Sequence, residues 1–205
     1  MEHRQPPVPL MAPQLSRKGS ESAIVGARPG AYHAPMKVQP FTFADDGDIP
    51  NHPHWPMIVY QGVLDVGEGD AASKFEDLFA RNGWGDGWRN GIYAFPHYHS
   101  NAHEVLGIAA GEAMVRFGGV AGKELKVSKG DAVLLPAGTG HQRLSASPDL
   151  LVIGAYPPGS GRDLMRSGER EKARIRERIG KVAKPLKDPV AGANGAMISL
   201  WSSNA

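Results

Sequence analysis

Three histidines and one glutamate have the spacing that could bring them together around a metal ion. His97 and His99 are two residues apart, so both side chains leave the same face of a β-strand. Glu104 and His141 each begin a later apolar run. Imidazole and carboxylate together suit Fe(II), Mn(II), Ni(II), Co(II) or Zn(II), and four such ligands leave positions open on an octahedral ion. The sequence therefore predicts one divalent transition metal per chain, with room for a further ligand.

The elements that would position these residues are short strands. From residue 91 onward the chain alternates short apolar runs with Gly, Ser, Asp and Pro turn signals, which is typical of a β-sandwich or barrel. The expected strands cover residues 36–43, 58–66, 91–95, 104–109, 112–118, 124–127, 132–135, 141–146 and 150–156. The 26 glycines and 17 prolines also favour many turns over long helices.

Two short helices are expected outside the barrel. Asp70 can cap the first, which runs to Arg81 before an Asn-Gly stop. The second is highly charged and spans about Ser167 to Val182. Its narrow apolar stripe places it on the barrel surface. The sequence thus predicts an all-β fold with two peripheral helices.

Composition excludes several other kinds of protein. The chain has no cysteine, which rules out disulfides, thiolate metal sites and cysteine nucleophiles. It has no run of 18 apolar residues and no apolar signal segment near its start, so we expect a soluble, cytoplasmic protein without membrane contact.

Charge is unevenly distributed along the chain, although the net charge is only +2. Residues 162–187 contain ten Lys or Arg and four Asp or Glu. Mixed-sign runs of this kind usually form a solvated helix face, so no nucleic-acid partner is expected.

Residues 1–35 are rich in Pro, Ser, Ala and Arg and lack apolar periodicity, which predicts a disordered N-terminal extension. A regulatory tail, a transit peptide and a start codon assigned too far upstream are all compatible with this composition. We favour a dispensable extension ahead of one domain over residues 36–205.

Strand alternation predicts which other side chains face the metal. Tyr93 and Phe95 share the face of His97, unless Pro96 introduces a bulge. Arg143 and Ser145 likewise follow His141. Tyr93, Arg143 and Ser145 are therefore substrate-contact candidates, with Arg143 as a guanidinium clamp for a carboxylate or phosphate. The alternative for Arg143 is a rim position, paired with a surface glutamate.

His103 is the ambiguous histidine. Because it is adjacent to Glu104, it should point to the opposite face of a regular strand, as a surface residue or as a neighbour of the ligands. A bulge at residues 100–102 could instead make it a ligand in place of His97 or Glu104. His52 and His54 lie in a proline-broken loop and are interpreted as structural.

The pattern around the first three ligands resembles the first motif of the cupin superfamily. Its conserved spacing is met by Gly91, His97, His99, Glu104 and Gly111. The motif covers residues 91–111, and two interlocking motifs are far more specific than a lone glycine-rich loop.

The second cupin motif matches residues 130–145 with one departure. Gly130, Pro136, Gly138 and His141 fit, but Ser145 stands where the family usually has Asn. Within the superfamily the chain resembles small single-domain bacterial cupins of the YjlB-like branch, through residues 45–51, 97–107, 138–141 and 188–190 and through Trp201. The resemblance covers about residues 36–202. It implies a double-stranded β-helix jelly roll, one metal and often a homodimer, but no particular reaction.

Two functions remain in competition. The favoured one is a metal-dependent enzyme, with dioxygenase-type or related lyase chemistry on a small anionic substrate. The alternative is a non-enzymatic module that binds a metal or a small ligand. A metal-free isomerase is disfavoured because all four ligands are kept. A pocket beside the metal lined by Tyr93 and Arg143 would favour the enzyme, and a metal sealed by Phe and Leu would favour the module.

Overall fold

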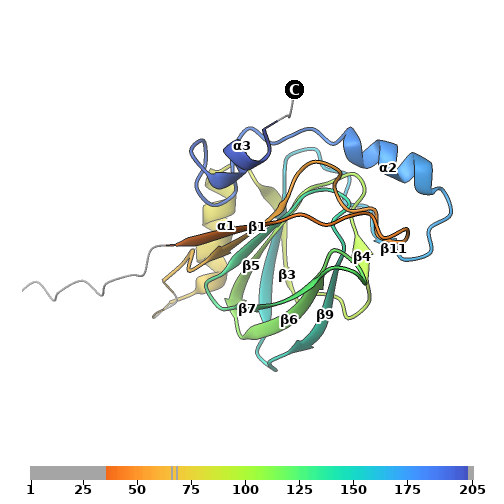
Figure 1. The fold of residues 1–205 in the computed structure, drawn as a ribbon. Helices are drawn as coiled ribbons and strands as arrows, with labels where there is room; N and C mark the ends of the chain where they lie inside the picture. Colours follow the sequence, from red (N-terminus) through yellow and green to blue (C-terminus); the bar gives the residue numbers. More distant parts are fainter. Residues whose placement is uncertain (1–35, 66, 68, 203–205) are drawn as a thin grey trace, which may run out of the picture. The chain divides into compact units, whose positions relative to one another are not determined.

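The computed structural model describes residues 36–65, 67 and 69–202, which form two antiparallel β-sheets and three short helices (Figure 1). The extension predicted for residues 1–35 lies outside the described residues. The larger sheet has the order β1-β2-β8-β5-β10-β3 and the smaller one β11-β4-β9-β6-β7. The crossing of sequence-distant strands within each sheet confirms the double-stranded β-helix that the cupin resemblance implied.

The strands are short, in keeping with the frequent turns. The larger sheet contains β1 (Lys37–Phe41), β2 (Met57–Gln61), β8 (Ala132–Leu135), β5 (Glu104–Ala110), β10 (Leu151–Tyr156) and β3 (Gly85–Asn90). The smaller sheet contains β11 (Met165–Arg166), β4 (His97–Tyr98), β9 (His141–Ala146), β6 (Glu112–Phe117) and β7 (Lys123–Ser128).

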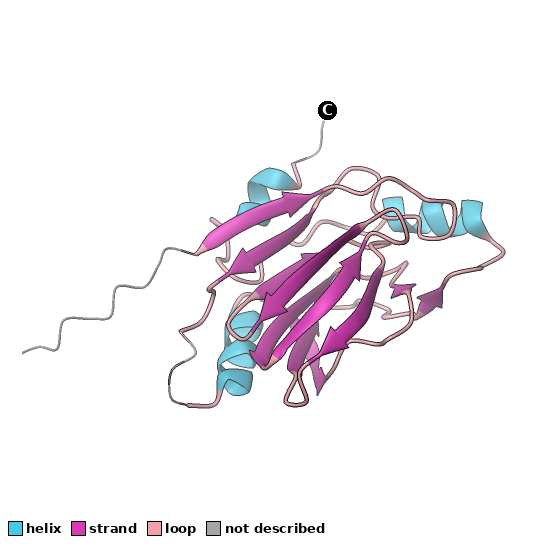
Figure 2. Cartoon of the chain, turned by 60° about the horizontal axis from the view of Figure 1, so that its bottom comes forward, coloured by secondary structure: helices cyan, strands magenta, loops and turns pink. Residues whose placement is uncertain are grey.

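The main core lies between the two sheets. Val115 and Phe117 of β6 face Leu106 and Ile108 of β5 within one buried cluster. The other face of the larger sheet is also buried, because α1 (Ala71–Arg81) and α3 (Ala196–Leu200) pack against it (Figure 2). Burial on both faces explains why β2, β5 and β8 read as continuous apolar runs rather than alternating ones.

The first predicted helix is confirmed. The Asp70 carboxylate accepts hydrogen bonds from the backbone N–H groups of Ala72 and Ser73, and the helix stops before Gly83, whose φ is +80°.

The charged helix α2 (Lys172–Gly180) is shorter than the expected 167–182. Its N-terminal boundary is later because β11 (residues 165–166), which pairs with β4, is followed by a turn in which Gly168 has a φ of +89°. A third helix, α3, was not expected; it has five residues, too few for a periodic pattern. No helix in the described part of the chain combines the length and the apolar character needed to cross a bilayer.

One strand lies elsewhere than expected. Residues 91–95 are not a strand; the strand β3 precedes them and pairs with β10. The sequence of β3, Gly-Asp-Gly-Trp-Arg-Asn, has no apolar alternation, so periodicity could not identify it. The strand expected over 58–66 also ends earlier, at Gln61.

Candidate metal centre

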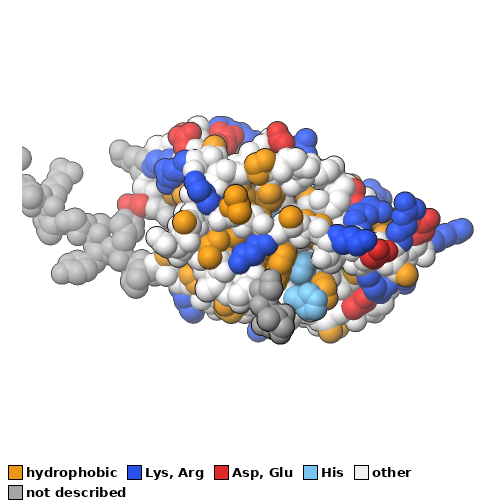
Figure 3. All heavy atoms as spheres, turned by 90° about the horizontal axis from the view of Figure 1, so that it is seen from above, with side chains coloured by type: hydrophobic (Ala, Val, Ile, Leu, Met, Phe, Trp, Pro, Cys, Tyr) orange, Lys and Arg blue, Asp and Glu red, His pale blue; other side chains and the backbone are white. Residues whose placement is uncertain are grey.

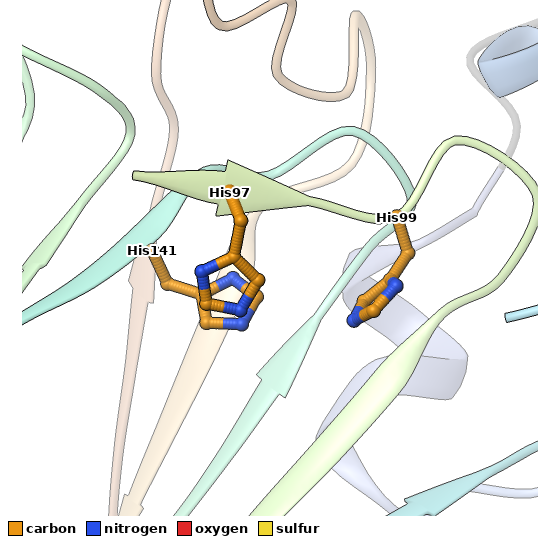
Figure 4. Close-up of side chains that lie close together, drawn as sticks. All are labelled: His97, His99 and His141. Atoms are coloured by element: carbon orange, nitrogen blue, oxygen red, sulfur yellow. The ribbon is translucent and has the colours of Figure 1, made fainter. Parts of the chain in front are cut away.

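The three predicted histidine ligands converge between the two sheets. His97 lies on β4, His99 follows it, and His141 begins β9 directly opposite His97 in the antiparallel pairing. Figure 4 shows their imidazoles gathered on one side of β4. One ring nitrogen from each lies within 4.8 Å of the others. This spacing fits three ligands of one metal ion.

The hydrogen bonds of the three rings fix which nitrogen is free. Nδ1 of His97 donates to the Phe95 carbonyl at 3.1 Å, and Nδ1 of His141 donates to the Thr139 carbonyl at 3.3 Å. Nδ1 of His99 donates to the carbonyl of Asp163. A proton on Nδ1 leaves the Nε2 lone pair available, and this is the way in which metal-binding histidines are oriented.

Glu104 completes the cluster, as the first residue of β5. Its Oε2 atom lies 3.4 Å from Nε2 of His99 and 3.4 Å from Nε2 of His141. Its Oε1 atom accepts a 2.6 Å hydrogen bond from the Tyr156 hydroxyl, whereas Oε2 is buried and has no hydrogen-bond partner. A buried carboxylate oxygen without a partner is costly unless a cation satisfies it, so the four side chains fit a divalent metal.

Burial and the mutual contacts of these side chains shift their pKa values in different directions. Burial alone would raise the pKa of Glu104, but the His99 and His141 imidazoles outweigh it and hold that pKa below its usual range. Burial, aided by His141, lowers the pKa of His97 to about 3. Burial also opposes protonation of His99, but the adjacent Glu104 carboxylate raises its pKa overall. At neutral pH the site therefore offers an anionic oxygen and a neutral His97, and metal binding would compete with protonation of His99.

A cavity of about 490 Å³ opens beside the cluster. Its volume lies within the range of about 300–1,000 Å³ that is usual for small-molecule sites. Besides the four predicted ligands it is lined by Trp88, Asn90, Gly91, Ile92, Tyr93, Leu106, Tyr156, Gly161, Arg162 and Leu164. The metal cluster is therefore accessible to a small molecule.

Only one of the three substrate-contact candidates lines this cavity. Tyr93 does so, with 49% of its surface exposed, and its ring stacks on Phe95 and meets His97 edge-on. Arg143 instead lines a second depression on the other side of residues 90–94. No ion pair to Arg143 is present among the described residues, so the predicted rim pairing with a glutamate is not seen either.

Ser145 is exposed, and the expectation that it faces the metal side is wrong. His141 and Arg143 pair with Phe117 and Val115, which are both buried, so alternation holds that far. The register then shifts, and Ser145 pairs with Met114 on the other face. One extra residue in β9, a β-bulge, reverses the face of every residue beyond it.

His103 points away from the cluster, as strand alternation predicted. It is fully buried among the rings of Trp55, Trp201 and His52. Its Nδ1 accepts a hydrogen bond from the backbone N–H of Ala137, and its Nε2 donates to the Ala183 carbonyl. With both nitrogens engaged, it ties the C-terminal segment to the barrel.

His52 is structural in the same cluster, as expected. It stacks on Trp55 at a centroid distance of 4.4 Å, and its Nδ1 accepts hydrogen bonds from the backbone N–H groups of His54 and Trp55.

Tyr156 and Trp88 were missed by the sequence analysis. Tyr156 ends β10, where its hydroxyl accepts a 2.8 Å hydrogen bond from Trp88 Nε1 while donating to Glu104. Gly154 makes room for the indole: a Cβ there would lie 2.1 Å from Trp88 Cε2. Tyr156 ends the predicted strand 150–156, but only the strand pairing shows that it reaches Glu104.

The loop over residues 161–164 connects the metal centre to α2. The Asp163 carbonyl holds His99, while its carboxylate accepts from the Ser100 backbone N–H and hydroxyl and from Arg178 of α2. Basic side chains gather with acidic ones at the end of the molecule that α2 occupies (Figure 3). Arg178 therefore contacts the predicted ligand His99 through one intervening residue, Asp163.

Comparison with known proteins agrees with this geometry. A family model described as Cupin matches residues 89–158, which contain all four predicted ligands. The uncharacterized protein YjlB of Bacillus subtilis (strain 168) is 40% identical to this chain over 166 residues, which cover 80% of this chain and 97% of that protein.

Solved structures show weaker likenesses. An acireductone dioxygenase from Bacillus anthracis, with a cadmium ion in its active centre, is 17% identical with a TM-score of 0.35, over 45% of this chain and 62% of that one. The DMSP lyase DddQ from Ruegeria pomeroyi DSS-3 is 14% identical with a TM-score of 0.32, over 66% of this chain and 54% of that one. Scores at this level carry no information about activity.

Proposed function

The chain belongs to the cupin family, in its YjlB-like group, and we propose that it is a divalent-metal-dependent enzyme acting on a small anionic substrate. The chemistry we propose is of the dioxygenase type or a related lyase type. The observation that carries this proposal is the unpartnered Oε2 of Glu104, which faces the Nε2 atoms of His99 and His141 beside an open cavity.

His97, His99, Glu104 and His141 would hold the metal. When bound, a divalent transition metal supplies a Lewis acid and, if it is redox-active, an exchangeable electron. The protein supports the arrangement through three backbone carbonyls that fix the imidazoles and through Tyr156, which fixes Glu104.

Two hydroxyls are the candidates for proton handling in the cavity. The Tyr156 hydroxyl is hydrogen-bonded to Glu104, and burial, followed by the charge of Glu104, raises its pKa. It is therefore held in the protonated form and can donate but not act as a base at neutral pH. Tyr93 is half exposed at the cavity wall and is free to meet a substrate.

A non-enzymatic metal- or ligand-binding module is the alternative. It is supported by the cavity lining, which, within the part of the chain that the structure describes, contains no Lys, Ser, Thr or Asp and no carboxylate other than Glu104. Such a wall provides few groups for general acid or base catalysis. The open cavity, which Tyr93 lines but Arg143 does not, argues against a purely structural metal, since such a metal needs no access. It is compatible both with the enzyme and with a ligand-binding module.

The test begins with elemental analysis of the protein purified without added metal. Oxygen consumption and product formation are then screened over small carboxylates, with the native metal restored. We expect about one divalent transition metal per chain and turnover that a Glu104→Ala variant lacks. Absence of bound metal in the wild type would overturn the proposal, and a metal-loaded protein that turns over no carboxylate would favour the binding module.

A further inference from the structure

We propose that Arg162 makes the cavity selective for small monocarboxylates that carry an apolar body. This inference rests on the proposed function, because the cavity is the one beside the metal centre. It extends that function by naming the residue that recognises the anion and the kind of molecule attached to it.

Arg162 is the cation of the cavity. Among the described residues that line it, only Arg162 carries a fixed positive charge, and only Glu104 carries a negative one. Glu104 belongs to the metal cluster and faces the imidazoles. A guanidinium that lines a cavity without a carboxylate partner attracts an anionic ligand and can bind a carboxylate with two parallel hydrogen bonds.

The guanidinium is held in place before any ligand arrives. Its Nη1 donates a 2.9 Å hydrogen bond to the Asp86 carbonyl, and its Cζ lies 5.5 Å from the ring centroid of Tyr156. These contacts use one of its five N–H groups and leave the others available. Because the side chain is already positioned, a ligand loses less free energy in ordering it.

The neighbouring Asp163 does not neutralise Arg162. Its carboxylate is engaged by Ser100 and by Arg178, and its backbone N–H donates to Asn101. The same contacts anchor the backbone of the loop, in which Arg162 adopts a left-handed φ of +48°. This conformation is uncommon for a residue other than glycine and persists where the surroundings impose it, often at ligand sites.

Several of the side chains that line the cavity are apolar. Ile92 and Leu106 are buried in the core and reach the cavity, while Leu164 and Tyr93 are partly exposed at its wall. Trp88 adds an indole whose N–H is already bound to Tyr156. An apolar ligand body would therefore gain burial against these side chains.

The presence of one guanidinium in the cavity also favours a ligand with a single negative charge. Sites for phosphate dianions usually combine several cations or backbone N–H groups at a helix N-terminus. The cavity has one guanidinium, and none of α1, α2 and α3 contributes a lining residue. The geometry therefore points to a carboxylate rather than to a phosphate ester.

The experiment measures binding by calorimetry with four matched probes: benzoate, benzyl alcohol, acetate and phenyl phosphate. The variants are Arg162→Asn, which tolerates the positive φ, and Arg162→Lys, which keeps the charge. Arg166→Gln is the control, because Arg166 is a nearby guanidinium that packs on Phe95 and does not line the cavity. Each protein is measured both metal-loaded and after removal of metal by a chelator.

We expect benzoate to bind the wild type more tightly than the other three probes. Arg162→Asn should weaken benzoate binding about 10-fold or more, the loss expected for a charge-assisted hydrogen bond, with little effect on benzyl alcohol. Arg162→Lys should recover part of the loss, and Arg166→Gln should bind benzoate like the wild type.

Three results would overturn the inference: equal benzoate affinity in the wild type and Arg162→Asn, acetate binding as tight as benzoate binding, or tighter binding of phenyl phosphate. The metal-free measurements separate this inference from the proposed function. A wild type that contains no metal contradicts the proposed function, yet the contrast between wild type and Arg162→Asn still tests the carboxylate site.

Discussion

The Tyr156 hydroxyl donates a 2.6 Å hydrogen bond to Oε1 of Glu104 and thereby turns the other oxygen toward the histidines. The two residues come from adjacent strands, β10 and β5, whose pairing brings them together. The hydroxyl itself accepts from Trp88, so the carboxylate orientation depends on a chain of two hydrogen bonds.

Tyr156→Phe should lower metal affinity about 10- to 100-fold without abolishing binding, because the carboxylate loses its orienting partner but remains present. Competition titration with a metal-chelating dye measures the effect. Tyr93→Phe is the control, since Tyr93 lines the same cavity and makes no hydrogen bond with Glu104, and it should keep the wild-type affinity. Equal affinities for wild type and Tyr156→Phe would show that Tyr156 does not orient the ligand.

Glu104→Ala and His141→Ala should each remove most of the bound metal, because each deletes one of four ligands. His103→Ala should retain the metal stoichiometry but lower the free energy of unfolding by about 1–3 kcal/mol. The reason is that the backbone N–H of Ala137 and the carbonyl of Ala183 lose their hydrogen-bond partner. Elemental analysis and urea unfolding of the same samples distinguish the two effects. Loss of metal from His103→Ala with retention in Glu104→Ala would mean that the ligand set is wrong.

Arg178→Gln should weaken metal binding, toward the lower end of the 10- to 100-fold range, by loosening Asp163 and with it His99. Arg176→Gln on the same helix is a matched control, because Arg176 pairs with the exposed Asp45 and does not contact the loop. The absorption spectrum of the Co(II)-substituted protein should shift in the first variant only. Identical spectra and affinities in both variants would remove Arg178 from this role.

Acid should destabilise the protein partly through His52. Its pKa is lowered to about 4, mainly by burial and secondly by the nearby His54. The unfolded chain binds this proton near pH 6.5 and the folded chain only near pH 4, so stability falls as pH drops from 6.5 toward 4.

His52→Gln should therefore lose less stability than the wild type between these pH values, as measured by urea unfolding. The other titratable groups facing His52 are His54 and His103, and they are unchanged in both proteins. Parallel pH profiles for the two proteins would contradict the prediction.

Nucleic acid should bind only weakly to α2. Its four cations and the adjacent Lys181 are paired with carboxylates: Lys172 with Asp48, Arg174 with Glu171, Arg176 with Asp45, Arg178 with Asp163 and Lys181 with Glu177. Binding of a labelled DNA duplex, followed by fluorescence anisotropy, should be independent of sequence and vanish near physiological salt. Sequence-dependent binding that survives at that salt would contradict this prediction.

The convergence of the three histidines and most of the strands were predictable because regular strands obey a period of two. The face of His97 and His99 follows from their spacing, and His141 and Arg143 obey the same rule. Features that break the period were not predictable. The bulge in β9, which turns Ser145 outward, adds a single residue and leaves no mark in the composition.

Arg162 was missed for a related reason. It lies in an irregular loop, and its approach to the cavity depends on a left-handed φ and on contacts of Asp163 with residues some 60 positions earlier. A count along the chain also overstates the local positive charge of residues 162–187, because it omits Asp45 and Asp48, which pair with two of the basic side chains.

The backbone carbonyls that accept from His97, His99 and His141 have a consequence for evolution and redesign. A carbonyl is present whatever side chain its residue carries, so the tautomer of each histidine is insensitive to substitution at Phe95 or Thr139. Mutations that reshape the surroundings of the cavity can thus accumulate while the imidazoles keep their orientation. Asp163 is the exception, because its own carboxylate holds the loop that presents its carbonyl.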